Sequence, residues 1–265
     1  MRLINYKMTL QYEGTRYRGW QKQPGVENTI QGKLETLLTR LLDTNVDVYG
    51  AGRTDAGVHA LGQTASFRVP EDALRKLAGV TTDLPSELRS AEDEALSREL
   101  NHYLPEDIAV PRLVRASDRF HARYLTSSKW YRYRIRTSPV SDVVNRRFLW
   151  QYAKELDLER MREGAAVLTG CHDFASFCGL KMKKSTVRTV TRIDITRPDE
   201  DTVILDFYGD GFLNHMVRLM TGELVEAGAG RQDQEAIREI LEKCCKGAAA
   251  HTAPASGLTL MEVRY

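Results

Sequence analysis

A glycine-rich stretch that carries one carboxylate is the part of this sequence best suited to chemistry. Residues 50–63 read GAGRTDAGVHALGQ and place Asp55 among four glycines. Glycines let a backbone turn tightly and lie close to another molecule. Strand-like sequence flanks the stretch on both sides, and loops between strands of a rigid scaffold often carry functional residues. A carboxylate placed there can trap or stabilise an electron-poor centre of a substrate.

The same residues also suit an ordinary turn, in which Asp55 hydrogen-bonds only its own backbone. Spacing alone favours this turn. A dinucleotide-binding loop is excluded, because its third glycine would fall at position 55, where the aspartate stands. A phosphate-binding loop is excluded as well, since no Gly-Lys-Ser/Thr triplet follows the stretch.

A second stretch alternates aromatic or aliphatic residues with cations. Residues 129–136 read KWYRYRIR. In a strand, Tyr131, Tyr133 and Ile135 share one face and the arginines share the other. A nucleobase could stack on the tyrosine face. The tyrosines could equally pack in a core while the arginines face water, and the residue types alone favour that arrangement.

A third stretch opens an expected helix. Residues 212–218 read FLNHMVR and follow Gly209-Asp210-Gly211, so the helix would carry Arg218 about two turns in. On residue types alone, Met216 and Val217 are core residues and His215 is structural.

The elements that must position these stretches repeat one pattern. Strands are expected at 6–12, 46–49, 64–69 and 108–114, and helices at 30–41 and 71–103, with an interruption near Pro85. The second half follows with strands at 129–137, 187–196, 202–208 and 258–265, and helices at 156–168, 212–227 and 232–246. Each half therefore has the β-α-β-β-α-β order of a ferredoxin-like fold.

We therefore expect an α+β fold of two ferredoxin-like, RRM-like halves. Their antiparallel sheets would be joined side by side, with helices on one face and an RNA-binding cleft on the other. The expected domains are residues 1–112, which carry the Asp55 loop, and residues 113–265, which carry Tyr131 and Arg218. The active site would then lie where the two halves join.

Composition and charge fit a globular protein with a local basic surface. The 265 residues are 42% hydrophobic and 28% charged, with a net charge of only +2. Between Arg112 and Arg136, however, eight basic residues face one acid, a local charge of 8 − 1 = +7. A second basic run spans residues 181–192. Either run suits a phosphate backbone or a solvated face equally well.

Several classes of site and location are not expected. The four cysteines form no C-x-x-C pair, so free thiols are expected and a zinc site is not. No apolar run approaches the ~20 residues that cross a bilayer. Because no signal peptide is recognisable, we expect a cytoplasmic protein without membrane association.

Taken together, the three stretches resemble one family. Residues 53–60, RTDAGVHA, closely resemble the signature of the TruA-type tRNA pseudouridine synthases, whose aspartate is the catalytic nucleophile. Residues 129–136 are similar to that family's Tyr-Arg-Tyr motif, whose first tyrosine contacts the target base. Residues 212–218 are similar to its Phe-x-x-x-Met-Val-Arg motif, whose arginine pairs with the aspartate. Shorter matches occur at 19–21, 29–31, 120–123, 173–177 and 252–258.

The resemblance implies a set of roles. Asp55 would be the nucleophile, Tyr131 would stack on the base, and Arg218 would orient Asp55. The expected substrate-binding residues are Tyr131, Arg53, His59, Phe212 and His215. The substrate would be the anticodon stem-loop of tRNA at positions 38, 39 and/or 40. Neither a cofactor nor a metal is expected, and the family implies a homodimer. The acidic stretch 80–98 looks longer than is usual in the family and is interpreted as a surface insertion.

Two other classes of protein fit part of the sequence. A non-catalytic RNA-binding protein could use the same two halves, but it would not require the Asp, Tyr and Arg set. An aspartate-dependent glycoside or nucleoside hydrolase would normally require a second carboxylate for acid–base work. Asp55 is the only acid in the glycine-rich loop. Release of free uracil would favour the hydrolase.

Overall fold

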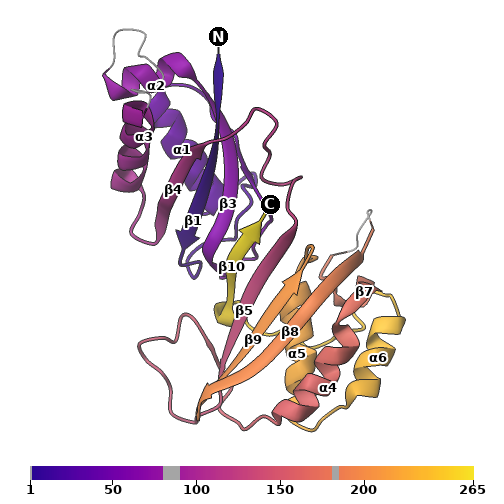
Figure 1. The fold of residues 1–265 in the computed structure, drawn as a ribbon. Helices are drawn as coiled ribbons and strands as arrows, with labels where there is room; N and C mark the ends of the chain where they lie inside the picture. The colour runs from indigo at the N-terminus through magenta and orange to yellow at the C-terminus, as the bar shows by residue number, and fades with distance from the viewer. Residues whose placement is uncertain (1, 80–89, 181–184) are drawn as a thin grey trace. The chain divides into compact units, whose positions relative to one another are not determined.

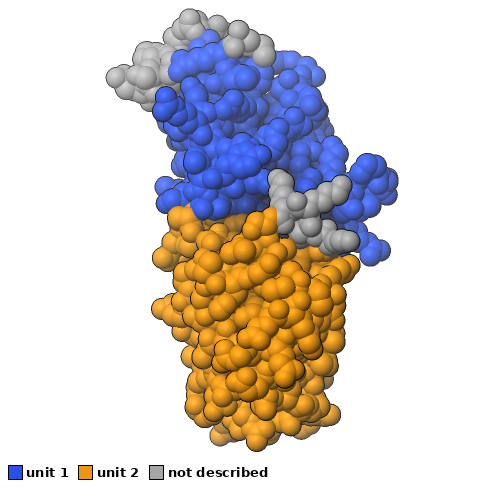
Figure 2. Space-filling view, turned by 90° about the vertical axis from the view of Figure 1, so that its right-hand side faces the viewer, with its two compact units in different colours: residues 1–126, 265 blue, residues 127–264 orange. Residues whose placement is uncertain are grey.

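The chain forms two compact units of mixed α and β structure. The computed structural model describes residues 2–79, 90–180 and 185–265. One unit comprises residues 1–126 with Tyr265, and the other comprises residues 127–264 (Figures 1 and 2). The described residues form ten strands and six α-helices, so the expected α+β class is confirmed. The division falls after Thr126, because the strand at 108–115 pairs within the first unit.

The first unit has the ferredoxin-like order of elements. They are β1 (Leu3–Tyr12), α1 (Ile30–Leu42), β2 (Val48–Gly50), β3 (His59–Pro70), α2 (Glu71–Ala78), α3 (Ser90–Tyr103) and β4 (Ile108–Arg115). The strands lie in the order β4-β1-β3-β2, and all three pairings are antiparallel. The helices lie together beside this sheet (Figure 1).

The pattern of apolar residues explains these elements. Tyr6, Met8 and Leu10 alternate along β1 and are fully buried. Thr29 begins α1, because its Oγ1 accepts the backbone N–H of Gly32 at 3.2 Å. Leu34, one turn further on, is also fully buried. A period of two and a period of 3.6 thus direct strand and helix toward one core.

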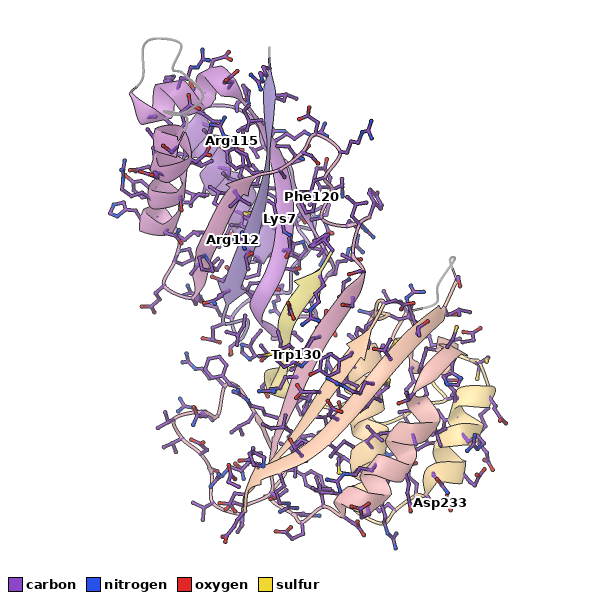
Figure 3. The ribbon with its side chains drawn as sticks, in the orientation of Figure 1. Lys7, Arg112, Arg115, Phe120, Trp130 and Asp233 are labelled. Carbon is purple, nitrogen blue, oxygen red and sulfur yellow. The ribbon has the colours of Figure 1, made fainter. Side chains whose placement is uncertain are left out.

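The acidic stretch is part of this helical layer where the structure describes it. The Glu92 side chain on α3 is only 1% exposed and accepts an Arg115 N–H at 2.7 Å. Arg115, which is labelled in Figure 3, also donates to Asp93 through Nε, at 2.8 Å. The expectation of a surface insertion is wrong for residues 90–98, because a long-range ion pair fixes this segment to β4. Residues 80–89, including Pro85, lie outside the described part of the chain.

The second unit repeats the order with additions. Its elements are β5 (Ser128–Arg136), β6 (Trp150–Gln151), α4 (Leu158–Leu168), β7 (Gly170–Asp173), β8 (Val187–Asp199), β9 (Thr202–Gly209), α5 (Met216–Gly228), α6 (Gln234–Glu242) and β10 (Leu258–Arg264). The strands lie in the order β10-β5-β9-β8-β7, and β6 pairs in parallel with β5. The first four strands of this order match those of the first unit.

The two faces of β5 differ as its alternation predicted. Tyr133 and Ile135 are fully buried. On the opposite face, Asp206 of β9 accepts two hydrogen bonds from Arg132, each at 2.9 Å, and one at 2.7 Å from the indole of Trp130, which is labelled in Figure 3. These bonds raise the pKa of Arg132. One carboxylate thus ties two side chains of the neighbouring strand together.

Removing that carboxylate should destabilise the second unit. We expect Asp206→Ala to lower the free energy of unfolding by about 1–3 kcal/mol, because the Arg132 charge loses a partly buried partner. Asp194→Ala is the matched control. Asp194 lies on β8, opposite Asp206 in the strand pairing, and forms an ion pair with Arg192. Both side chains of that ion pair are exposed, so its loss should cost less than about 0.5 kcal/mol. Urea denaturation at one protein concentration measures both. Equal losses would contradict this account of the pair.

Candidate active site

The loop that carries Asp55 is clamped by a second loop of the first unit. Thr54 accepts the backbone N–H of Trp20 at 3.1 Å, and Gly57 donates its own to the Tyr17 carbonyl at 3.3 Å. The backbone carbonyl of Asp55 accepts the N–H of Val58 at 3.2 Å. Backbone atoms of Asp55 and Val58 therefore form the turn, and Asp55 is half-buried at its start. The Asp55 side chain therefore extends from a backbone that main-chain hydrogen bonds hold in place.

Two glycines permit this close approach. A Cβ on Gly14 would lie 2.0 Å from the Val58 carbonyl oxygen. Gly19 has a φ of +89°, and its Cβ would lie 2.7 Å from the Thr54 carbonyl oxygen. Both obstacles are backbone atoms, which cannot move aside as a flexible side chain can. Only glycine fits at these two positions without displacing the Asp55 loop.

Arg53 is exposed but oriented by a row of amides. Its Nε donates to Gln21 Oε1 at 2.9 Å, and Gln21 donates in turn to Gln31 at 2.7 Å. Gln31, on α1, then donates to the Val48 carbonyl at 3.0 Å. The matches at 19–21 and 29–31 included both glutamines, but the sequence did not reveal this role. Their contacts join segments that are distant in the sequence, so the local spacing of residues does not predict them.

His59 lies inside the first unit. It is the first residue of β3 and is 2% exposed. Its Nδ1 accepts the backbone N–H of Gly14 at 2.9 Å. This bond fixes the loop that clamps Asp55. The geometry assigns His59 a positioning contact, and its contact with substrate stays a prediction.

The second unit brings Tyr131 and Phe212 together. Their rings meet edge to face, with centroids 5.3 Å apart and planes at 84°. Tyr131 is 7% exposed, so little of its surface faces solvent. Edge-to-face packing of this kind holds an aromatic ring in one orientation.

The helix that carries Arg218 begins later than predicted. Residues 213–216 form a turn, which the Met216 backbone N–H closes by donating to the Leu213 carbonyl. His215 has a φ of +61°, a left-handed conformation that cannot continue a right-handed helix. α5 therefore starts at Met216, and Arg218 lies in its first turn. The expectation of a helix from residue 212, with Arg218 two turns in, is wrong for this reason.

Backbone contacts fix Arg218. Its Nε donates to the Ala253 carbonyl at 2.8 Å, and Ala253 donates its N–H to the Arg218 carbonyl at 3.1 Å. The neighbouring Pro254 carbonyl accepts the Tyr133 hydroxyl at 2.7 Å. Burial raises the pKa of Tyr133, and the positive charge of Arg218 offsets part of that rise.

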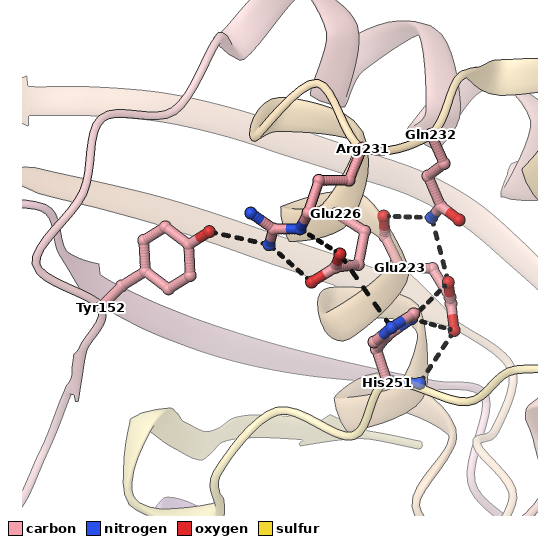
Figure 4. A network of polar contacts seen from close by, with 6 residues as sticks. All are labelled: Tyr152, Glu223, Glu226, Arg231, Gln232 and His251. Carbon is pink, nitrogen blue, oxygen red and sulfur yellow. Dashed lines mark hydrogen bonds and ion pairs between the residues drawn. The ribbon is translucent and has the colours of Figure 1, made fainter.

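A polar network anchors the segment that holds Arg218. Glu223, on α5, is fully buried and accepts the His251 backbone N–H at 3.0 Å and a Gln232 N–H at 3.0 Å (Figure 4). Arg231 forms an ion pair with Glu226, which also lies on α5, and lowers the pKa of the Glu226 carboxyl. The segment leading to Ala253 is thereby tied to the same helix that carries Arg218.

Parts of the basic runs are already engaged within the chain. Arg115, Arg132 and Arg136 each pair with a carboxylate of their own unit. Arg123 instead lines a hollow beside Arg53. The second run is described only at Arg188 and Arg192, since its three lysines lie outside the described residues. The charges of these three arginines are therefore partly neutralised within their own units.

Other classes of site leave no trace in the described residues. Over 2–79, 90–180 and 185–265, no group of three or more His, Cys, Asp or Glu is placed to hold a metal ion. All four cysteines are free thiols. None of the helices in these ranges is both long and apolar enough to span a bilayer.

The site residues predicted from sequence fall into two groups. The first unit holds Asp55, Arg53 and His59 on one clamped loop and the strand that follows it. The second unit holds Tyr131 on β5, together with Phe212, His215 and Arg218 at the start of α5.

Comparison with known proteins identifies the family. The family model described as tRNA pseudouridine synthase matches residues 8–125 and 165–265, which include Asp55 and Arg218. A protein named tRNA pseudouridine synthase A 2, from a strain of Bacillus cereus, is 37% identical over 262 residues. That alignment covers 98% of this chain and 99% of the relative. Another, named tRNA pseudouridine synthase A, from Moorella thermoacetica, is 40% identical over 265 residues and covers 98% of both.

A solved Cbf5-Nop10-Gar1 complex is only distantly similar. The match has a TM-score of 0.37 and 10% identity, and it covers 97% of this chain and 49% of that chain. The sequence relatives cover nearly the whole chain, and the family model agrees with them over residues 8–125 and 165–265. The chain therefore belongs to the TruA-type family of tRNA pseudouridine synthases, which are isomerases that act on tRNA.

Proposed function

We propose that this chain converts uridine to pseudouridine in the anticodon stem-loop of tRNA, at one or more of positions 38, 39 and 40. The observation that carries the proposal is Asp55, presented on a clamped loop within the stretch RTDAGVHA. Family membership supports the reaction. The resemblance to TruA-type enzymes supports the anticodon stem-loop, a homodimer and a cytoplasmic location.

The proposed reaction needs no added group. The N1–C1′ glycosidic bond of the uridine breaks, the uracil turns, and C5 bonds to C1′. The hydrogen on C5 leaves as a proton and N1 gains one, so the product is an isomer of the substrate. The chemistry therefore requires a carboxylate to trap or stabilise the electron-poor ribose or base, and exclusion of water while the base is detached.

Asp55 is the proposed nucleophile. The backbone on either side of it is held by main-chain bonds, in which Thr54 accepts from Trp20 and Gly57 donates to Tyr17, so little freedom is lost when a substrate binds. The glycosidic bond is inaccessible while the uridine is stacked, so the target nucleotide must be flipped out. Arg53 is exposed two residues away and is oriented by Gln21. We propose that it holds the flipped nucleotide or fills the space it vacates.

Tyr131 and Arg218 complete the proposed site. Tyr131, packed edge to face against Phe212, would present a fixed ring for the detached uracil to stack on. Arg218 would form an ion pair with Asp55 and keep it ionised and oriented. Its Nε bond to Ala253 sets the plane of the guanidinium, and a fixed plane suits a two-point ion pair. His59 and His215 would act at the edge of this site.

Replacing Asp55 should abolish the chemistry and leave the fold intact. We expect Asp55→Asn to slow tritium release from tRNA labelled at uracil C5 by about three or more orders of magnitude, because the amide is a poor nucleophile. Asp47→Asn, at an exposed position of the same unit, is the control and should match the wild type. Tritium release at the wild-type rate by Asp55→Asn would refute the assignment. Free uracil as the product would indicate a hydrolase instead.

Replacing Arg218 by lysine should affect the chemical step more than RNA binding. Lysine keeps the charge but loses both the Nε bond to Ala253 and the planar fork. We expect single-turnover tritium release to fall about 100-fold, as a misplaced catalytic group can cost. Affinity for unmodified tRNA should stay within about twofold. Arg238→Lys, on the exposed face of α6, is the control. Parallel losses of rate and affinity would show that Arg218 binds RNA instead of orienting Asp55.

A further inference from the structure

A row of three aromatic rings lies at the surface beside the Asp55 loop. The rings of Tyr49 and His121 have centroids 5.0 Å apart, and those of His121 and Tyr124 are 4.4 Å apart. The interplanar angles are 45° and 35°. Tyr49 is 48% exposed and Tyr124 is 77% exposed. Large rings are normally buried, so a contiguous row of them at a surface indicates a binding site.

Rigid backbone holds the row in place. Tyr49 belongs to β2, directly before the Asp55 loop, and is paired with Ser66 on β3. The Ser66 hydroxyl accepts the Ala122 N–H at 3.1 Å, and Tyr265 donates its hydroxyl to the Ala122 carbonyl at 2.9 Å. Ala122 itself is fully buried. Both ends of the row are thus fixed to the strand that follows Asp55.

Further packing beneath the row strengthens this attachment. Phe120 packs against Tyr265 with centroids 5.0 Å apart. The Lys7 ammonium lies 4.3 Å from the Tyr265 ring and 5.3 Å from the Phe120 ring (Figure 3). The buried side of the segment 120–124 is occupied by these contacts, which leaves the rings on its other side to meet a ligand.

Cations adjoin the row. Arg123 and Arg53 both line a hollow of about 220 Å³ whose walls also include Tyr49 and Trp20. The Arg123 backbone N–H is accepted by His121 Nδ1 at 3.1 Å, so the proton of the neutral ring lies on Nε2. Partial burial, together with the charges of Arg123 and Arg68, lowers the pKa of His121. The lowered pKa favours the uncharged form of the middle ring, which can stack as a flat plane.

We propose that Tyr49, His121 and Tyr124, with Arg123, form a stacking platform for an unpaired base that neighbours the target uridine in the tRNA loop. Aromatic rings accept the face of any base, and guanidinium groups bind the phosphates between bases. Flat rings interleaved with cations match the chemistry of single-stranded RNA. This inference rests on the proposed function, and it adds a substrate contact within the first unit alone.

The test compares loop binding with duplex binding. The full chain is titrated with an unmodified anticodon stem-loop and, separately, with a fully paired duplex of the same length. We expect Tyr124→Leu and Tyr49→Leu each to weaken stem-loop binding about tenfold or more, which is the scale of one lost base stack. Duplex binding should be unchanged, because phosphates dominate it. Tyr124→Phe keeps the ring and should bind the stem-loop like the wild type.

A matched control removes an exposed tyrosine elsewhere in the same unit. Tyr103, at the end of α3, is 51% exposed and lies against Arg40, so Tyr103→Leu also deletes a ring beside an arginine. It should leave stem-loop affinity unchanged. Because Tyr49 and Tyr124 are exposed, their variants should fold. Thermal unfolding of each variant would check this.

Several outcomes would overturn the platform. They are stem-loop affinity that does not change in either leucine variant, equal losses for duplex and stem-loop, or failure of Tyr124→Phe to restore binding. A change in sedimentation of the leucine variants with RNA affinity intact would assign the row to a protein interface. If the wild type released no tritium yet bound the stem-loop through Tyr124, the proposed reaction would fail while the platform stood.

Discussion

The close approach of two backbone segments in the first unit is the constraint on which the site depends. Residues 14–20 lie against residues 51–58, and the carbonyls of Thr54 and Val58 come so near that Gly14 and Gly19 have no room for a side chain. The contact is between main-chain atoms, so it moves little when side chains change rotamer. A carboxylate carried on such a loop is preorganised, and preorganisation is a large part of how enzymes stabilise a transition state.

The second unit follows the same principle with different parts. The Ala253 carbonyl fixes Arg218, and a fully buried carboxylate, Glu223, ties the segment before Ala253 to the helix that bears Arg218. In both units, a candidate site residue is held by main-chain groups from a segment distant in sequence: the backbone of the Asp55 loop in the first unit and the Arg218 side chain in the second. Gln21 and His251 each position such a segment: Gln21 accepts a hydrogen bond from Arg53, and the His251 backbone N–H donates to Glu223.

Periodicity predicted most of the architecture, and long-range contacts account for what it missed. Alternation along residues 6–12 and 129–136 identified β1 and β5, whereas the assignment of Asp55 from its octamer stays a prediction. The start of α5 was misplaced, because the left-handed backbone of His215 is not encoded in residue type. The burial of Glu92 was missed because its partner, Arg115, comes from another element. The aromatic row was missed for the same reason, since Tyr49 and the segment that carries His121 and Tyr124 come together only because both are bonded to β3 at Ser66.

Direct mapping of pseudouridine in tRNA is the measurement that tests the proposed reaction most closely. Unmodified tRNA would be incubated with the purified chain in buffer without any added cofactor, and every uridine would then be examined. We predict new pseudouridine at one or more of positions 38, 39 and 40, with the tRNA mass unchanged because the reaction is an isomerisation. Uridine that stays unmodified at all three positions, or a loss of mass equal to a uracil base, would contradict it.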